Sequence, residues 1–236
     1  MTRHDGLTLG TFTGDYVVTL SGPLAAIDGT LPTCQDKSGV ERALGTPTTL
    51  AFVAGEATCA LKLYRAESTS VDATLGTYSS AADPAWDLDV AVNTDTGHGS
   101  ESLLSATPNP GETGATVTIA VQVRDSYGNN TVTSGSDVVG IAVAGANTVP
   151  VVIMSHVGGG IFEGTYAPTN PGQDLISGLV NGSVISHDTD GTSDGVYHED
   201  IVAYHFEVTG SSTQVAGTSQ PLTVSARFQD GTINTA

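Results

Sequence analysis

A short segment of this chain occurs twice, at a spacing that limits what the chain can fold into. Thr118–Asp125 (TIAVQVRD) resembles Thr223–Asp230 (TVSARFQD), and the two copies begin 105 residues apart. A step of similar length toward the N-terminus arrives near Tyr16–Leu20, which is another run of strand-forming residues. About 100 residues is the length of one small β-sandwich. The repeat therefore predicts one module over residues 1–99, a second over 100–209, and over 210–236 either the opening strands of a third module or an exchanged donor strand.

Runs of alternating apolar and polar residues recur along the chain and indicate strands. In Val117–Val123 the odd-numbered positions are apolar and share one face, while Ala120 and Gln122 lie on the other. This period of two is expected of a strand with one buried face. Similar short runs are separated by Gly, Pro, Asn and Ser. The sequence predicts an all-β fold of tandem immunoglobulin-like β-sandwich domains, although Val40–Ala43 also fits a helical turn.

The charge of the chain narrows the choice of partners. Its 25 acidic residues outnumber its 7 lysines and arginines, and the net charge is −18. Such a chain repels phosphates and anionic lipids, so we expect no nucleic-acid partner. No run approaches the ~20 apolar residues of a membrane helix, so we expect no membrane insertion. The first six residues lack the apolar core of a signal peptide, which leaves an internal cut of a larger exported protein, another export route, or a virion protein.

The two cysteines, Cys34 and Cys59, both lie in the predicted first module. A bridge between them would close a loop of 25 positions, which the chain-entropy treatment values at about 3 kcal/mol. An even number of cysteines in a chain of extracellular character predicts this disulfide. Two buried free thiols are the alternative.

Two motifs in the second module carry a resemblance to a known family. The strand Val117–Val123 leads into the turn Asp125–Asn129 (DSYGN). Further on, Gly164–Thr169 (GTYAPT) is followed by Gly172–Ile176 (GQDLI) and then by Asn181-Gly182. With these motifs the module resembles the bacterial immunoglobulin-like repeats of the invasin and intimin type. Residues 60–67 in the first module resemble such repeats more distantly, and residues 211–236 resemble only the first two strands of another repeat.

The resemblance implies a non-enzymatic, extracellular or cell-surface protein, either a structural stalk or an adhesin segment. Its partners would be neighbouring modules or subunits and a host receptor or glycan, and no catalytic residues carry over because the family has none. Similar modules occur on phage virions, so a virion or extracellular filament subunit is the alternative. A carbohydrate-binding module is a third reading, with Trp86 as the stacking aromatic; a core or interdomain position for Trp86 is favoured over it.

One acidic segment, His187–Gly195, has the residue types of a calcium site. Asp188, Asp190 and Asp194 are spaced so that a tight glycine turn would bring their oxygens together on Ca²⁺. The segment has no glutamate at the twelfth position and no flanking helices, so it is not a complete EF-hand. The alternative, which we favour, is a long acidic hairpin loop stabilised by Asp and Gly turns. No cofactor is required by the sequence, and calcium is the one that it favours. Zinc bound by His187, His198 and His205 is a weaker alternative, because these residues have no recognised ligand spacing.

The C-terminal segment also carries a prediction of its own. Two strands cannot bury a sandwich core alone. If they are not followed by further strands, the apolar positions would be inserted into a neighbouring subunit by strand addition. The alternative is that the repeat array continues. The residues that would be exchanged are Leu222, Val224, Ala226 and Phe228.

Overall fold

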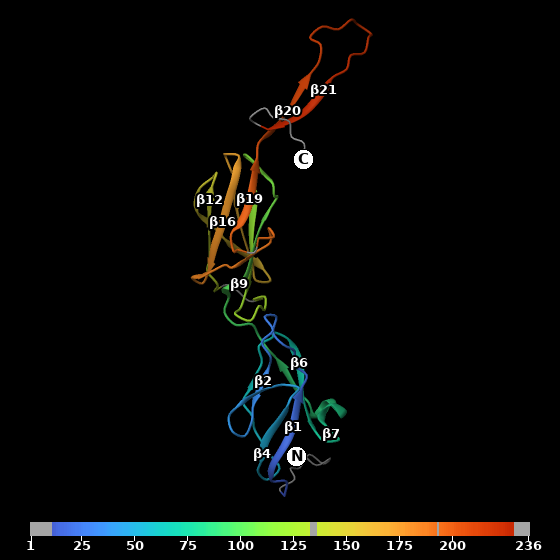
Figure 1. The fold of residues 1–236 in the computed structure, drawn as a ribbon, viewed down its shortest axis with the longest axis vertical. Helices are drawn as coiled ribbons and strands as arrows, with labels where there is room; N and C mark the ends of the chain where they lie inside the picture. The colour runs from blue at the N-terminus through green and yellow to red at the C-terminus, as the bar shows by residue number, and fades with distance from the viewer. Residues whose placement is uncertain (1–10, 133–135, 193, 229–236) are drawn as a thin grey trace. The chain divides into compact units, whose positions relative to one another are not determined.

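The computed structural model describes residues 11–132, 136–192 and 194–228 (Figure 1). Regular structure in this part consists of β-strands and two three-residue 3₁₀ turns, Ser80–Ala82 and Pro84–Trp86. None of these residues belongs to a helix long and apolar enough to span a membrane. The chain separates into two compact units. The first runs up to Asp95 and includes Asp125–Asn129, and the second consists of Thr96–Arg124 with the residues from Asn130 onward.

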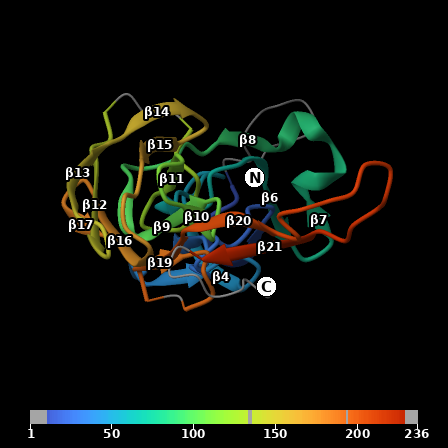
Figure 2. The same ribbon diagram turned by 90° about the horizontal axis from the view of Figure 1, so that it is seen from above.

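Two sheets form the body of the second unit. One has the strand order β14-β15-β11-β9-β18 and the other β10-β19-β16-β12-β13, with β17 also paired to β16. Figure 2 shows β12, β16 and β17 grouped on one side of β9 and β11. The first sheet contains β9 (His98–Thr107), β11 (Val117–Arg124), β14 (Ser155–Gly158), β15 (Ile161–Tyr166) and β18 (His187–Asp188). The second contains β10 (Gly111–Glu112), β12 (Val139–Gly145), β13 (Val149–Ile153), β16 (Gly172–Val180), β17 (Ser183–Val184) and β19 (Tyr197–Val202).

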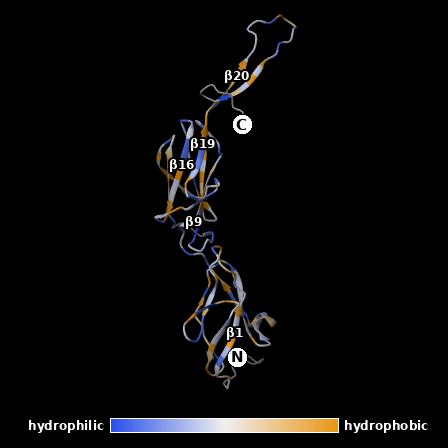
Figure 3. Cartoon of the chain, viewed as in Figure 1, coloured by the Kyte–Doolittle hydropathy of each residue, from blue (hydrophilic) through white to orange (hydrophobic). Residues whose placement is uncertain are grey.

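The core of the second unit lies between these two sheets. Along β11 the alternation read from the sequence is realised, because Val117, Ile119, Val121 and Val123 are all completely buried. They belong to one apolar cluster with side chains of the facing sheet, including those of β12, β16 and β19. Each such aliphatic side chain contributes about 1.5–3 kcal/mol through burial. Figure 3 shows hydrophobic and hydrophilic positions interleaved along the strands, as this arrangement requires.

The first unit is also all-β but buries fewer apolar side chains. One sheet has the order β4-β1-β6-β7, with β8 also paired to β6, and a second has the order β3-β2-β5. Among the described residues of this unit, the buried apolar side chains are Val18, Ala26, Cys34 and Leu50. The strands are β1 (Gly14–Ser21), β2 (Thr33–Gln35), β3 (Glu41–Ala43), β4 (Pro47–Phe52), β5 (Leu61–Lys62), β6 (Ser68–Leu75), β7 (Tyr78–Ser79) and β8 (Leu88–Ala91). The segment that also fitted a helical turn therefore contains strand β3.

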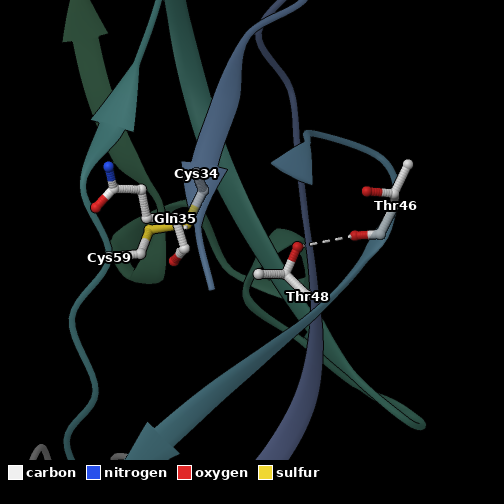
Figure 4. The surroundings of a disulfide bond; sticks show 5 residues. All are labelled: Cys34, Gln35, Thr46, Thr48 and Cys59. Carbon is white, nitrogen blue, oxygen red and sulfur yellow. Dashed lines mark hydrogen bonds between the residues drawn. A yellow bond between two sulfur atoms is a disulfide. The ribbon is translucent and has the colours of Figure 1, made fainter. Parts of the chain in front are cut away.

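A disulfide joins Cys34 in β2 to Cys59, just before β5 (Figure 4). The two Cα atoms are 5.8 Å apart. Cys34 is among the most buried side chains of the first unit, at 1% exposure. Thr48 lies in the same region, with its hydroxyl donating to the carbonyl oxygen of Thr46 at 3.2 Å (Figure 4). The bridge thus ties two segments of the smaller sheet together where apolar burial is sparse.

The last two strands, β20 (Tyr204–Thr209) and β21 (Thr223–Phe228), form an antiparallel two-stranded sheet. In this hairpin Thr223 is paired with Thr209. In the second unit the equivalent position of the repeat, Thr118 on β11, is paired with Thr107 on β9. The hairpin therefore repeats the antiparallel β9–β11 pairing of two threonines, with 13 residues between the paired threonines instead of 10.

Candidate functional site

The acidic segment folds into a compact loop between β18 and β19. Asp188 is 7% exposed, and its two carboxylate oxygens accept hydrogen bonds from the amides of Asp190 and Gly195 at 3.2 and 3.0 Å. Asp194 accepts one from the amide of Val196 at 2.9 Å. These are the aspartate-initiated turns that short acidic loops use to satisfy their own backbone.

Asp190 makes the strongest set of contacts in this loop. One carboxylate oxygen accepts from the amide and the hydroxyl of Thr192 at 2.8 and 2.7 Å. The other accepts from the amide of His198 at 2.7 Å and lies 2.8 Å from its Nδ1. Burial opposes ionisation of Asp190, but these hydrogen bonds outweigh it and hold the pKa of that carboxyl well below its usual range. The carboxylate of Asp190 in turn raises the pKa of His198.

In the described part of the loop, the three carboxylates accept hydrogen bonds from backbone and side-chain donors. Each of the three predicted ligands is bound to a different set of donors within the loop. The part of the chain that the structure describes, from which Ser193 is missing, holds no group of three or more His, Cys, Asp or Glu side chains able to bind a metal ion. Calcium at Asp188, Asp190 and Asp194 stays a prediction, and the observed hydrogen bonds are those of the hairpin-loop alternative.

The C-terminal hairpin has one apolar and one polar face. Side chains directly opposite each other in an antiparallel pair lie on the same face. Phe206 faces Ala226, and Val208 faces Val224. On the other face Glu207 lies opposite Ser225 and forms an ion pair with Arg227. Most of the apolar side chains are open to solvent, with exposures of 70% for Phe206, 60% for Val208, 60% for Leu222 and 62% for Val224.

The residues predicted to be exchanged correspond to core positions of the second unit. Shifted back by 105 residues, the positions of Leu222, Val224, Ala226 and Phe228 become Val117, Ile119, Val121 and Val123. Those four side chains are completely buried in the second unit. Leu222 immediately precedes β21, and the side chain of Phe228 lies outside the described part, as does that of Trp86. Strand exchange by these residues stays a prediction.

Another exposed apolar surface lies at the β13–β14 edge, and the sequence analysis did not single it out. A depression of about 670 Å³ lies there. Val151, Ile153 and Val157 are 66%, 83% and 56% exposed around it. The alternation of Val149, Val151 and Ile153 was a usable signal, but only the fold shows that this face lies outside the core.

The aspartate of the DSYGN motif holds its own turn together. Asp125 is 1% exposed and accepts hydrogen bonds from the amides of Tyr127 and Asn129 at 2.9 and 3.0 Å. Asn129 extends the network within the first unit, because its side chain donates to the carbonyl of Tyr64 at 2.7 Å and accepts from the amide of Ala66 at 2.9 Å. Asp125 and Asn129 of the motif therefore serve to provide hydrogen-bond partners for backbone groups around the turn.

A second buried polar network joins three loops and strands of the second unit. Asp174 on β16 is completely buried and accepts hydrogen bonds from the amide and side chain of Asn147, at 2.7 and 3.0 Å, and from Tyr166 Oη at 3.0 Å. Asn147 Oδ1 in turn accepts from the amides of Thr169 and Asn170 at 2.8 and 2.9 Å. The motif residues of GTYAPT and GQDLI are therefore linked through one carboxylate.

No protein-family model matches the sequence, and no curated protein matches it either. Among solved structures, the chain is similar to the filamin domain of Lin-41, with 24% identity over 45% of this chain and 97% of that one, at a TM-score of 0.35. It is similar to FdeC, an Escherichia coli adhesin, with 18% identity over 93% and 64% of the two chains, at a TM-score of 0.42. It is also similar to invasin, a bacterial integrin-binding protein, with 15% identity over 100% and 43%, at a TM-score of 0.38.

The class of protein follows from the strand order rather than from these values. A sheet with β15, β11 and β9 at its centre, facing a sheet built on β12, β16 and β19, is an immunoglobulin-like sandwich. The all-β, immunoglobulin-like prediction is thus confirmed. The chain spans 64% of FdeC and 43% of invasin, so it corresponds to part of each.

Proposed function

We propose that this chain is a non-enzymatic structural or adhesive segment of an extracellular bacterial protein, built from tandem immunoglobulin-like modules. The observation that carries the proposal is the repeated β9–β11 pairing, which recurs as an antiparallel pair in β20–β21 with Thr223 in the place of Thr118. Repetition of one sandwich favours a spacer that sets length and presents loops, because each module closes its own core. The sequence predicts module limits of 1–99, 100–209 and 210–236. Because β20 (Tyr204–Thr209) pairs with β21, we propose that the third module begins before β20 rather than at 210.

The acidic loop and both buried networks support a structural role for the polar residues. Asp125, Asp174 and Asp190 each satisfy backbone or side-chain donors inside the fold. These hydrogen bonds hold the loops in place. A host receptor or glycan would bind to those loops. This would be a role of the kind described for the adhesin FdeC and the integrin-binding protein invasin, although the support comes from the repeat and the networks.

The proposal is tested by where the protein lies and what it contacts. Antibodies against the full chain should label intact source cells as strongly as permeabilised ones. The purified full chain should also bind cultured host cells or members of a glycan panel in a saturable way, with the same chain unfolded by heat as the control. Label confined to permeabilised cells would contradict the extracellular placement, and surface label without any binding would leave the structural role.

A filament or virion subunit is the second candidate, and the apolar face of the β20–β21 hairpin favours it. Two strands alone are marginally stable in water, and an exposed apolar hairpin is suited to strand addition. A head-to-tail contact of this kind would be heterologous and would produce an open filament. Deletion from Ser211 onward should abolish assembly seen by electron microscopy; assembly that survives the deletion would exclude strand exchange by this segment.

A further inference from the structure

Two carboxyl side chains lie side by side in the interior of the second unit. Asp174 on β16 and Glu199 on β19 are directly paired in the antiparallel register. Both are 0% exposed. Opposed side chains on one face of such a pair have Cβ atoms about 4.5–5.5 Å apart. Two acids therefore share one end of an otherwise apolar core.

The hydrogen-bond donors at this place are divided unequally between the two acids. Asp174 accepts three hydrogen bonds, two from Asn147 and one from Tyr166. Among the described residues, neither oxygen of Glu199 has a hydrogen-bond partner of good geometry. A buried carboxylate without partners is costly, whereas a protonated carboxyl is much less so. The hydrogen-bond donors at this site thus stabilise a negative charge on Asp174 and not a second one on Glu199.

Most of the surroundings of Glu199 disfavour a second negative charge, and the amide of Gly111 is the exception. Burial raises the pKa of Glu199 to about 7, the nearby amide of Gly111 opposes the rise, and the charges of Asp200 and Asp174 add to it. Tyr166 on β15 is the other titratable neighbour, and burial raises its pKa as well. The backbone of Gly111 lies close to this carboxyl, because a Cβ placed on Gly111 would meet Val117, Glu199 Oε1 and Ile201.

The segment that covers Glu199 pairs with β19 over a short ladder and is held by hydrogen bonds at its two ends. The amide of Thr113 donates to the Val202 carbonyl at 3.1 Å, and the amide of Asp200 donates to Asn109 Oδ1 at 3.3 Å. Strand β10 consists of two residues, Gly111 and Glu112, in parallel register with Ile201 and Val202 of β19. Asn109 adds side-chain hydrogen bonds to Tyr197 Oη and the His198 carbonyl at 3.3 and 2.9 Å. A short ladder at the edge of a sheet opens more readily than the central strands, and its opening would let water reach a buried group.

We propose that the Asp174–Glu199 pair makes the β10–β19 edge a pH-sensitive latch. With Glu199 protonated, β10 stays closed over the carboxyl. When Glu199 loses its proton, the second charge beside Asp174 is relieved by separation of β10 from β19 and entry of water. The latch does not depend on the proposed function of the chain.

The direction of the effect is the reverse of the usual one for an acid. The pKa of Glu199 is raised from 4.5 to about 7 in the folded protein, so the folded state binds more protons than the unfolded state between these values. The contribution to stability is fully present below pH 4.5 and is lost as the pH rises to about 7. The unfolding constant of the second unit should therefore rise on the order of a hundredfold over this range.

The test compares the full-length wild-type chain with Glu199→Gln, a neutral side chain of the same shape. Urea unfolding and amide hydrogen exchange at residues 111–113 are measured at pH 5 and pH 8. At pH 5 the two proteins should agree within a few-fold. At pH 8 the variant should have an unfolding constant lower by up to a hundredfold and slower exchange at these amides. Taking the ratio at each pH removes the intrinsic pH dependence of exchange.

Two matched variants isolate the effect. Glu163→Gln removes an exposed glutamate on β15 and should leave the pH dependence unchanged. His198 is the other residue of β19 whose pKa is raised, so it also makes the folded state less stable as the pH rises. His198→Asn removes this contribution, and the stability difference between proteins with and without Glu199→Gln should persist in that variant. An equal stability difference between wild type and Glu199→Gln at both pH values would overturn the latch. If Glu199→Gln does not fold, the carbon-13 signal of the wild-type Glu199 carboxyl decides: a midpoint near pH 7 supports the latch, and one near pH 4.5 refutes it.

Discussion

At the scale of single residues, Asp174 stands out because several loops depend on one carboxylate. Removing it by Asp174→Ala leaves two donor groups of Asn147 and the hydroxyl of Tyr166 buried without an acceptor. We expect a loss of about 2–4 kcal/mol in the free energy of unfolding of the second unit. Tyr166→Phe, which deletes only one of these hydrogen bonds, should cost about 1 kcal/mol. Urea unfolding of both variants measures the difference, and equal costs would show that the network does not act through Asp174.

The His198–Asp190 pair predicts a second residue-scale effect, in this case of pH. A histidine that gains a carboxylate partner stabilises the fold below its unfolded pKa, and this contribution is lost as the pH rises through the folded pKa. The folded pKa of His198 lies above its ordinary value of 6.5. An NMR titration of its ring should therefore have a midpoint above 6.5, and Asp190→Asn should bring the midpoint down.

The control for this titration is Glu163→Gln, which changes an exposed carboxylate on another strand. It should leave the His198 midpoint where it was. If Asp190→Asn also leaves the midpoint unchanged, the 2.8 Å contact between His198 Nδ1 and Asp190 does not persist in solution.

At the scale of elements, the disulfide compensates for the sparse core of the first unit. Its two cysteines are 25 residues apart in the sequence, and a loop of this length is worth about 3 kcal/mol in the chain-entropy treatment. The double variant Cys34→Ala, Cys59→Ala should therefore raise hydrogen exchange in β1, β4 and β6 while leaving β11 and β16 protected. Loss of protection in β11 and β16 to the same extent would contradict this assignment, and the oxidised wild type is the control.

The elements that were predicted correctly from the sequence are those whose pattern is set by burial alone. The alternation in Val117–Val123 follows directly from one buried and one open face, and β11 has those limits to within a residue. The alternating run Thr58–Tyr64 also has the pattern of a strand, but only Leu61–Lys62 within it forms one, β5, and Cys59 is held by the disulfide. The alternation of apolar and polar residues alone does not reveal whether a segment is held by strand pairing or by a disulfide.

Other elements depend on pairing between distant segments. Strand β18 lies parallel to β9, pairing His187 with Leu103, and nothing in its two residues predicts that partner. The pairing of Asp174 with Glu199 depends on the register of β16 and β19 in the same way. In the acidic loop the residue types fit both calcium and aspartate-initiated turns, and the sequence alone does not show which backbone donors each carboxylate accepts from.

At the scale of the whole molecule, two opposing effects act between copies of the chain: the net charge makes them repel, and exposed apolar surface favours their association. A net charge of −18 makes two chains repel, and salt screens this repulsion within about 10 Å at 0.1 M. The apolar face of the hairpin carries no charge among its described side chains, Phe206, Val208, Val224 and Ala226. Self-association through this face should therefore strengthen as salt is raised, whereas association through ion pairs would weaken.

Sedimentation velocity at low and high salt distinguishes these cases. In wild type we expect the average mass to rise with protein concentration, and more steeply in 0.5 M than in about 0.05 M salt. Val208→Ser with Val224→Ser should abolish the rise, because it replaces two opposed apolar side chains that are 60% and 62% exposed. Thr209→Ser with Thr223→Ser changes the neighbouring pair and serves as the matched control. A wild-type chain that stays monomeric at every salt concentration would refute the filament candidate and leave the tandem spacer as the remaining role.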